Sequence, residues 1–487
     1  MTQGGKIPQH THLMGVCGVG MAAMAGILKE LGHRVTGSDE HPYPPMSTFL
    51  EDLGVPLMAG YRPENLEPAP DLVVVGNVIR RDNPEAQAML AGNLPHISLP
   101  EALNRYLVGR HQSLVVTGTH GKTTTTAILA WLLFALGMDP GFMVGGIAKN
   151  FSANYRVGQG PYVVLEGDEY DTAFFDKRPK FVHFTPRVGV ITSMEFDHAD
   201  IYADINQVYK AFEAFMRRMQ VGSRLLAWGD DTTMRSVCMR YGATVQYYGL
   251  KEHLYWQAGQ IVPVQGGMNF TVYRRRKFWG NFTVPLMGVH NVLNALAALA
   301  TMGELGVQPH PMAQALEDFR GVKKRQEIHG EFQKVLVIED FAHHPSAVAA
   351  TLKGVREAYP GRRLLAVFEP RTNTSRRKIF QQPYAESFGD ADVVLIREPS
   401  DLWNVPPEEQ FSAFQLVKDL VAQDKKAFYF PDTDKLLNGL LRGLEHDDVV
   451  LIMSNGDFDH LVPRLCQALG GKYREGQPEK LPVISDQ

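Results

Sequence analysis

The chain has few cysteines, no strong excess of charge of either sign, and no long apolar run. Its three cysteines, Cys17, Cys238 and Cys466, are far apart and odd in number, which argues against a disulfide framework or a cysteine-based zinc site. A net charge of −4 argues against a nucleic-acid partner held by a strong positive field. The longest apolar run, residues 127–136, is about half the length needed to span a bilayer. We therefore expect neither nucleic-acid nor membrane partners.

The N-terminal residues lack the long apolar core of a signal peptide, so we expect a cytoplasmic location. Hydrophobic residues make up 44% and charged residues 21% of 487 residues, which is typical of a globular protein. This length favours about three domains.

Short apolar runs that predict strands alternate with helical patterns along most of the chain. Such alternation indicates parallel sheets, with functional loops after the carboxyl ends of the strands. Two breaks divide the pattern, at the polar stretch 109–113 and near Gly321. A β-rich patch at 244–284 interrupts the middle segment. We predict three α/β domains in series, with bounds 1–110, 111–322 and 323–487.

The strongest local motif is GTHGKTTT, residues 118–125, between a predicted strand and an apolar helix. Backbone N–H groups of such a loop, with the helix N-terminus behind them, form a concavity for phosphate oxygens. Lys122 would reach the terminal phosphates of ATP, and the Thr123 hydroxyl would hold Mg²⁺. The longer P-loop pattern has glycine where this chain has Val116, so the loop is a shortened variant. The predicted ATP-binding residues here are Gly118, Thr119, His120, Gly121, Lys122, Thr123 and Thr124.

Two further strands of the middle segment end in acidic motifs, EGDEYD at 166–171 and EFDHAD at 195–200. In a parallel sheet both strand ends lie at the same edge as the phosphate loop. Their side chains are therefore expected to converge on Mg²⁺. Taken singly, each motif also fits a solvated acidic loop.

The turn Gly18-Val19-Gly20-Met21-Ala22-Ala23 matches the G-x-G-x-x-A pattern, and Asp39 follows at about the ribose-binding distance. The match alone says only that a pyrophosphate fits this helix start. A UDP group satisfies it as well as NAD does, and a glycine turn kept for packing remains an alternative.

Three polar residues near the second boundary suit a nucleotide: Asn291 for an adenine edge, Arg325 for a phosphate and Asp340 for a ribose hydroxyl. Taken alone, each is more often structural. The adjacent His343 and His344 suggest a metal site, but neighbouring histidines in a strand or loop point apart, which argues against it.

The order of the motifs GTHGKTTT, EGDEYD, EFDHAD, GVHNVLNA, KKRQE and EDFAHHP resembles the Mur ligase family over nearly the whole chain. The resemblance implies a Rossmann-like N-terminal domain that binds a UDP-sugar, a central P-loop ATPase domain, and a Rossmann-like C-terminal domain that closes over ATP and binds peptide. It assigns Lys122 to the γ-phosphate and Thr123, Glu166 and His198 to Mg²⁺, with Lys122, Glu166 and His198 as catalytic residues. It places Gly18, Gly20, Ser38, Asp39 and Asn77 at the UDP-sugar.

Within the family, the segments 43–48, 172–178 and 369–374 resemble members that join L-alanyl-γ-D-glutamyl-meso-diaminopimelate to UDP-N-acetylmuramate during murein recycling. The alternative is a member that adds L-alanine, which typically has Pro-His-Arg-Tyr where this chain has residues 370–373. We expect Arg371, with Asn373 and Arg376, to hold a peptide carboxylate, because arginine pairs with carboxylates in two parallel hydrogen bonds.

The chain departs from the family pattern at three places. Gly167 stands where alanine is usual, Ser193 where asparagine is common, and the segment around Lys210 gives no match for the carbamylated lysine of several members. Two rivals from other classes are an NAD-dependent dehydrogenase, which leaves GTHGKTTT without a role, and a non-enzymatic ATP-driven switch.

Overall fold

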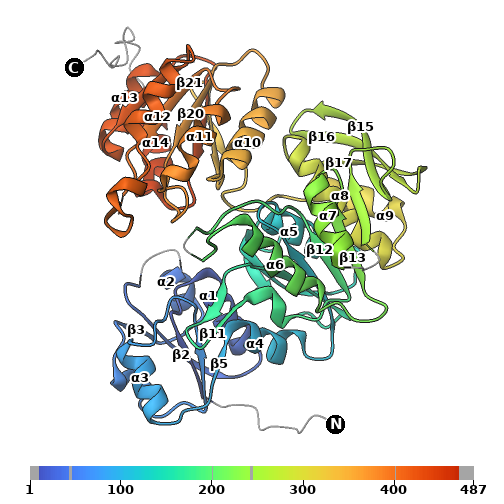
Figure 1. Cartoon of the computed structure of the whole chain (residues 1–487), viewed down its shortest axis with the longest axis vertical. Coiled ribbons are helices and arrows are strands. Elements are labelled where there is room, and N and C mark those ends of the chain that lie inside the picture. Colours follow the sequence, from blue (N-terminus) through green and yellow to red (C-terminus); the bar gives the residue numbers. More distant parts are fainter. Residues whose placement is uncertain (1–9, 43–45, 200, 242–244, 401, 471–487) are drawn as a thin grey trace.

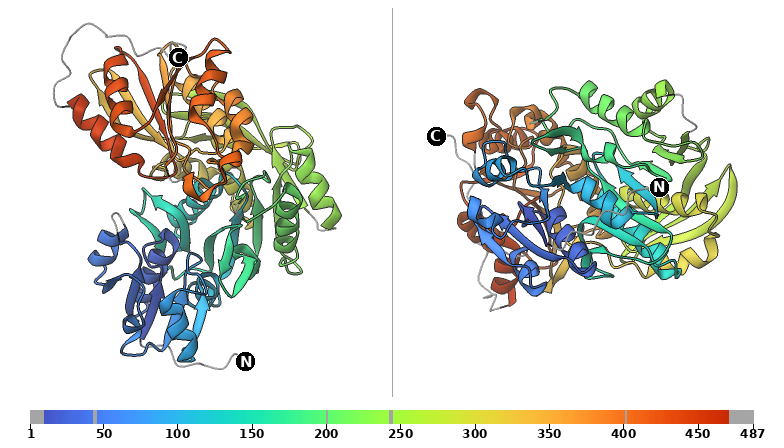
Figure 2. Two further views of the ribbon diagram at one scale, coloured as in Figure 1. Left: turned by 60° about the vertical axis from the view of Figure 1, so that its left-hand side comes forward. Right: turned by 90° about the horizontal axis from the view of Figure 1, so that it is seen from below.

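The computed structural model describes residues 10–42, 46–199, 201–241, 245–400 and 402–470 of the chain. The motif residues Tyr43, Pro44, Pro45 and Asp200 lie outside the described residues. Three α/β bodies follow one another, each built on its own sheet, and the central body contacts the other two (Figures 1 and 2). Within the described ranges, no helix is long and apolar enough to cross a bilayer.

The N-terminal body has a fully parallel sheet of order β3-β2-β1-β4-β5. Short strand-like runs at 12–16, 34–36 and 71–75 predict β1, β2 and β4, whereas β3 and β5 are too short to carry a pattern. The strands are β1 (His10–Met14), β2 (Arg34–Asp39), β3 (Leu57–Ala59), β4 (Leu72–Val75) and β5 (His96–Ser98). The helices are α1 (Val19–Glu30), α2 (Met46–Asp52), α3 (Pro84–Ala91) and α4 (Leu99–Leu103).

The central body has a sheet of order β17-β16-β15-β14-β13-β12-β6-β9-β7-β8. The half that carries the GTHGKTTT loop consists of β6 (Gln112–Thr117), β7 (Gly141–Ala148), β8 (Ala153–Arg156), β9 (Tyr162–Gly167), β12 (Val188–Ile191) and β13 (Arg224–Trp228). The β-rich patch adds β14 (Val245–Gly249), β15 (Trp256–Val264), β16 (Gly267–Arg274) and β17 (Lys277–Val284). The helices are α5 (Lys122–Ala135), α6 (Ile205–Met216), α7 (Thr232–Tyr241), α8 (Val289–Glu304) and α9 (Pro309–Glu317). A separate two-stranded hairpin consists of β10 (Asp171–Ala173) and β11 (Asp176–Pro179).

The C-terminal body has a sheet of order β18-β19-β23-β20-β21-β22, in which only β18 runs antiparallel to its neighbour among the described strands. Its strands are β18 (Glu327–Phe332), β19 (Val335–Asp340), β20 (Leu364–Phe368), β21 (Val393–Arg397), β22 (Lys426–Phe430) and β23 (Val449–Met453). Its helices are α10 (Pro345–Ala358), α11 (Gln381–Ser387), α12 (Ala413–Val421), α13 (Thr433–Gly443) and α14 (Leu461–Gly470).

The predicted fold class, with three α/β domains in series and parallel sheets, is confirmed. The predicted boundaries fall just before β6 and just after Val322, which pairs with Ala148 in an isolated bridge. Strands β7 and β8 were not predicted, because glycines interrupt the apolar pattern of β7 and the four residues of β8 are too few to carry a pattern.

Glycines allow close backbone contacts where the bodies meet. Gly288, at the start of α8 with φ of +86°, lies against Gly354 of α10, so that a Cβ on Gly288 would be 2.9 Å from the Gly354 Cα. Gly26 of α1 faces the ring of Tyr155 on β8, and a Cβ there would be 2.3 Å from Tyr155 Cζ. Glycine at position 26 therefore allows the N-terminal body to pack closely on the central one.

We predict that Gly26→Ala destabilises this contact by about 1–3 kcal/mol, because the Tyr155 ring must move from a buried position. The expected result is a lower midpoint of thermal or urea unfolding. Gly389→Ala is the matched control, since nothing lies within 4 Å of a Cβ there and its φ is not positive. Equal midpoints for the two variants would contradict the packing argument.

Candidate active site

A cavity of about 690 Å³ lies where the three bodies meet. The N-terminal body contributes Gly20, and the central body contributes the phosphate loop and the ends of β9 and β12. The C-terminal segment contributes Arg325 and Asp340. Residues separated by more than 300 positions in the sequence therefore line one space, as the predicted closure of a C-terminal domain over a nucleotide requires.

The phosphate loop has the glycines that its backbone needs. Gly118 has a φ of +136°, and a Cβ there would be 2.1 Å from Thr192 Oγ1. Gly121 has a φ of +79°, and its Cβ would be 2.4 Å from Asn294 Oδ1. Both positions exclude side chains, so the loop passes closely between β12 and α8 and leads directly into α5. The local structure is the strand, loop and helix that an anion site requires.

The Lys122 ammonium is held by a carboxylate that sequence analysis missed. Lys122 Nζ lies 2.7 Å from Glu169 Oε2, and the other oxygen of Glu169 lies 2.9 Å from His198 Nε2. Lys122 Nζ also donates to the Gly118 carbonyl oxygen at 2.6 Å. Desolvation lowers the pKa of Lys122, but the Glu169 and Asp168 carboxylates outweigh it and raise this pKa, so the ammonium is charged. Glu169 thus links two of the predicted catalytic residues.

Thr123 and Glu166 meet at the predicted metal site. Thr123 Oγ1 donates to Glu166 Oε1 at 3.0 Å, and the Gly145 N–H donates to Glu166 Oε2 at 2.7 Å. Arg325 Nη2 donates to Thr123 Oγ1 at 3.3 Å, so the C-terminal segment reaches the same hydroxyl. Burial raises the pKa of Glu166 despite the nearby Lys122. These two oxygen donors form one group, and His198 joins them through Glu169 and Lys122 rather than by direct contact with Thr123.

Another acidic residue of the first motif, Asp168, is fixed by a lysine that was not predicted. Lys180 Nζ lies 3.0 Å from Asp168 Oδ2. Burial alone would raise the pKa of Asp168, but Lys180 and Lys122 lower it to about 2. The cavity wall therefore carries an ionised carboxylate at neutral pH.

The predicted adenine and ribose residues lie in the cavity wall, where they already have partners within the protein. Asn291 Nδ2 donates to Gln326 Oε1 at 3.0 Å and to the Met287 carbonyl oxygen at 2.9 Å. The Asp340 carboxylate accepts from the Gln326 N–H at 2.8 Å and the Ala342 N–H at 2.7 Å. Both residues thus fix the joint between the central and C-terminal bodies, and their contacts with a nucleotide stay predictions.

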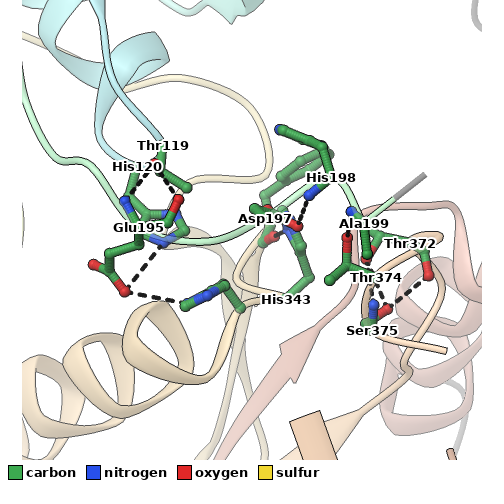
Figure 3. Close-up of polar contacts among 12 residues, drawn as sticks. Thr119, His120, Glu195, Asp197, His198, Ala199, His343, Thr372, Thr374 and Ser375 are labelled. Atoms are coloured by element: carbon green, nitrogen blue, oxygen red, sulfur yellow. Dashed lines mark hydrogen bonds and ion pairs between the residues drawn. The ribbon is translucent and has the colours of Figure 1, made fainter. Parts of the chain in front are cut away.

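The second acidic motif forms the seam between the central and C-terminal bodies (Figure 3). Ser346 Oγ donates to Glu195 Oε2 at 2.7 Å, and His344 Nε2 lies 3.2 Å from the Phe196 carbonyl oxygen. His343 Nε2 lies 3.5 Å from Asp197 Oδ2. The Ala199 N–H donates to Thr374 Oγ1 at 3.1 Å. The residues on both sides of His198 therefore contact the C-terminal body.

The chain's serine at position 193 supports the phosphate loop. Ser193 Oγ accepts from the His120 N–H at 2.7 Å, and the Ser193 carbonyl oxygen accepts from the Thr119 N–H at 3.1 Å. Thr119 Oγ1 accepts from the Glu195 N–H at 2.9 Å. These bonds join the phosphate loop to the end of β12.

The predicted UDP-sugar residues separate into several environments. Ser38 is fully buried and donates to Glu85 Oε1 at 2.7 Å, within the interior network around Glu85, and its contact with a UDP-sugar stays a prediction. Asp39 Oδ2 accepts from the Cys17 N–H at 2.9 Å and so holds the glycine turn that contains Gly18. Gly20 lines the large cavity.

Asn77 lies in a second, open pocket of about 510 Å³. This pocket also includes Arg80 and Arg81 of the N-terminal body and Lys177 of the β10–β11 hairpin. It has a basic character that the sequence analysis did not predict.

The predicted peptide residues lie beside the large cavity. Thr372 and Asn455 line it, whereas Arg371, Asn373 and Arg376 are not among its lining residues. Arg371 is 39% exposed and its Nη1 lies 3.0 Å from Asp457 Oδ1. Arg376 Nη2 donates to Asn373 Oδ1 at 2.7 Å, which fixes the loop itself. Arg371 therefore lies next to a cavity-lining residue without lining the cavity itself, and its role in holding a peptide carboxylate stays a prediction.

Comparison with known proteins gives the class of the chain. Family models match all three bodies: Mur ligase family, catalytic domain, at residues 10–111; Mur ligase middle domain at 116–302; and Mur ligase, glutamate ligase domain, at 324–456. The chain belongs to the Mur ligase family, whose members are ATP-dependent ligases that form amide bonds.

Relatives within the family differ in the substrate that they are named for. The chain is 37% identical to the UDP-N-acetylmuramate–L-alanyl-γ-D-glutamyl-meso-2,6-diaminoheptandioate ligase of Haemophilus influenzae, over 95% of this chain and 99% of the relative. It is 32% identical to a UDP-N-acetylmuramate–L-alanine ligase of Endomicrobium trichonymphae, over 92% and 96%. The crystal structure of a murein peptide ligase from Psychrobacter arcticus matches with a TM-score of 0.71 and 33% identity, covering 96% of this chain and 100% of that one.

We predict that Lys122→Ala abolishes ATP-dependent turnover, because the phosphate loop loses the one ammonium that it holds next to Gly118 and Glu169. Losing a charge aimed at the transferring phosphoryl group costs several kcal/mol of transition-state stabilisation, about a hundred-fold or more in rate. Initial rates of phosphate release measure the effect, and thermal unfolding shows whether the fold is intact.

Lys277→Ala serves as the lysine control, since Lys277 is exposed on β17 far from the loop in sequence and structure. A Lys122→Ala variant that kept more than about a tenth of wild-type turnover would refute the assignment of this lysine to the γ-phosphate.

Proposed function

We propose that the protein joins the amine of L-alanyl-γ-D-glutamyl-meso-diaminopimelate to the carboxylate of UDP-N-acetylmuramate, with ATP cleaved to ADP and phosphate. The observation that carries the proposal is the single cavity in which Lys122, the Thr123–Glu166 pair and Arg325 meet. It occurs in a chain 37% identical, over 95% of its length, to a relative named for this reaction.

The reaction needs activation of the carboxylate, because a carboxylate is a poor electrophile and does not condense with an amine in neutral water. Transfer of the γ-phosphoryl group of ATP to the lactyl carboxylate gives an acyl phosphate, in which phosphate is the leaving group. The neutral amine of the peptide then attacks the acyl carbon. The resulting tetrahedral intermediate expels inorganic phosphate and leaves the amide.

During these steps the chain's own residues position the phosphates of ATP and neutralise their negative charge. Backbone N–H groups of residues 121–123, at the start of α5, hold phosphate oxygens, and the Lys122 ammonium lies beside them. Binding of a polyphosphate frees Lys122 from Glu169, which keeps His198 as its partner. Arg325 brings a second positive charge from the C-terminal segment. Such preorganised charges stabilise the transferring phosphoryl group.

A magnesium ion fits the oxygen donors that meet here. Thr123 and Glu166 would hold it, with His198 beside them, and oxygen donors are those that Mg²⁺ prefers. When bound, Mg²⁺ would neutralise negative charge that develops on the transferring phosphoryl group.

Closure protects the acyl phosphate from water. The contacts of residues 195–199 with His343, His344, Ser346 and Thr374 bring the C-terminal body against the site. Since hydrolysis of the acyl phosphate would waste ATP, excluding water is part of the catalytic role of this seam. The UDP-sugar would lie along Gly18, Gly20 and Asp39, with the basic pocket at Asn77 suited to its phosphates.

The substrate assignment is tested by phosphate release with UDP-N-acetylmuramate and ATP, comparing the tripeptide with free L-alanine as the amine. We expect turnover with the tripeptide to exceed that with L-alanine by at least about a hundred-fold in kcat/KM, which corresponds to lost carboxylate contacts worth a few kcal/mol. Preference for L-alanine would assign the chain to the L-alanine-adding reaction instead. Phosphate release that needs no amine would favour an ATP-driven switch.

A substitution at Arg371 tests whether this residue holds a carboxylate of the peptide. Its guanidinium pairs with Asp457 beside Thr372 and Asn455, both of which line the cavity. We predict that Arg371→Lys raises KM for the tripeptide about ten-fold or more while KM for UDP-N-acetylmuramate changes little, because a point charge replaces a bidentate clamp.

The matched control is Arg362→Lys, since Arg362 pairs with Glu331 of β18 and does not line the cavity. Equal changes in KM for both substrates would remove Arg371 from the peptide site and leave the ligase proposal intact.

A further inference from the structure

Three side chains with metal-binding atoms meet at the seam between the phosphate loop and the C-terminal body, in addition to the Thr123–Glu166 pair. His120 belongs to the phosphate loop, Glu195 follows β12, and His344 caps the N-terminus of α10. One ligand atom from each residue lies within 4.8 Å of the other two. Figure 3 shows His120 and Glu195 facing each other at this seam.

Hydrogen bonds determine which ring nitrogen of His344 faces the group. His344 Nε2 lies 3.2 Å from the Phe196 carbonyl oxygen, which can only accept, so Nε2 carries the proton. The Ser346 N–H donates to His344 Nδ1 at 3.3 Å, which agrees with a lone pair on that atom. Nδ1 lies 3.6 Å from Glu195 Oε2. Ser346 Oγ lies 2.8 Å from His344 Nδ1 and 2.7 Å from Glu195 Oε2, so it bridges these two atoms, and a cation would bind them in its place.

His120 completes the group with an atom that has no partner. His120 Nε2 is buried and makes no hydrogen bond to any described residue, and it lies 3.8 Å from the same Glu195 oxygen. The rings of His120 and His344 are 4.6 Å apart between centroids. A buried polar atom without a partner is costly, and a cation among the three ligand atoms would satisfy it.

We propose that His120, Glu195 and His344 form a binding site for a borderline transition-metal ion such as Zn²⁺, which fastens the C-terminal body to the phosphate loop. Two imidazoles and one carboxylate, with a fourth position open, are a common zinc donor set, whereas Mg²⁺ prefers oxygen donors alone. Tetrahedral bonds of about 2.0–2.1 Å place ligand atoms about 3.4 Å apart. The separations of 3.6 and 3.8 Å from Glu195 Oε2 exceed this value by tenths of an ångström, and the ligand atoms of the two histidines lie within 4.8 Å of each other.

The surroundings also suit metal ligation by His344. A ligating imidazole typically donates its other N–H to a carbonyl or carboxylate, which fixes the ring and its tautomer, and Phe196 provides that carbonyl. Two ligands come from the central body and one from the C-terminal body. Bound metal therefore stabilises the closed arrangement by mass action and slows the opening that product release requires. The ion is distinct from the catalytic Mg²⁺, and its binding does not depend on the proposed ligase reaction.

Cobalt provides the direct test, because the visible absorption of Co²⁺ distinguishes a four-coordinate nitrogen and oxygen site from a six-coordinate one. We expect full-length wild-type protein, in millimolar Mg²⁺ and without ATP, to bind one Co²⁺ per chain with a four-coordinate spectrum, and Zn²⁺ to displace it. His344→Gln and Glu195→Gln should each weaken binding at least about ten-fold, as loss of a ligand does.

Two matched variants separate this site from its neighbours. His343→Gln alters the adjacent histidine, which pairs with Asp197, and Glu166→Gln removes the carboxylate of the proposed Mg²⁺ site. Both should keep the Co²⁺ spectrum. Loss of the spectrum in Glu166→Gln with its retention in His344→Gln would overturn the proposal, as would a six-coordinate spectrum or no Co²⁺ bound at 100 µM.

Crystals of wild-type protein grown with Zn²⁺ decide the matter even if a variant fails to fold. Anomalous scattering at the zinc edge should show an ion between His120, Glu195 and His344, and a peak elsewhere or no peak would overturn the proposal. Failure of either test leaves the ligase assays unaffected, because these use Mg²⁺ and phosphate release as their readout.

Discussion

The arrangement of the active site depends on one buried carboxylate, that of Glu169. A lysine ammonium as enclosed as that of Lys122 needs a counter-charge, since an unpaired charge away from water is expensive. Glu169 supplies it and holds His198 with its second oxygen. The phosphate loop and the loop after β12 thereby share one partner. An anion that took Lys122 from Glu169 would leave this carboxylate with His198 as its partner, and the two loops would no longer share it.

Loop 195–199 transmits such changes to the C-terminal body. It lies directly after β12, next to the phosphate loop, and four of its residues have polar contacts with residues 343–346 or 374. His198 within it has a φ of +58°, a left-handed conformation that non-glycine residues seldom adopt. The site and the domain interface are thus built from the same short segment, which explains why the motif EFDHAD contains more polar residues than metal binding alone requires.

Much of the fold follows from local sequence. Continuous runs such as Leu114–Thr117 and Val449–Met453 predict buried parallel strands, because both faces of such strands are covered. The strands at 141–148 and 153–156 escaped prediction, because their pairing with β9 and with each other depends on partners distant in sequence. Tertiary contacts decide such segments more than local propensity does.

For the site, motif order predicted the contact between Thr123 and Glu166 and the presence of Arg325 in the same cavity. It could not reveal the role of Glu169, because the motif EGDEYD offers several carboxylates and only the geometry shows which one pairs with Lys122. Nor could it reveal the partner of Ser38, because a serine at the end of a strand fits both a ligand and an interior network, and the buried Glu85 that accepts its hydroxyl is 47 residues away. Nor did the sequence show that the adjacent His343 and His344 both contact the central body, His343 at Asp197 and His344 at the Phe196 carbonyl oxygen.

The glycine pair at Gly288 and Gly354 has a mechanical consequence. Helices that meet through side chains interlock as ridges in grooves, and turning one past the other requires side chains to change rotamers. Where α8 begins against α10, two bare backbones touch instead. Because no side chains interlock at this contact, a rotation of the C-terminal body about it would require no change of side-chain rotamers there. The glycine contact would set the axis of such a rotation. The polar contacts of residues 195–199 with the C-terminal body would set its end point.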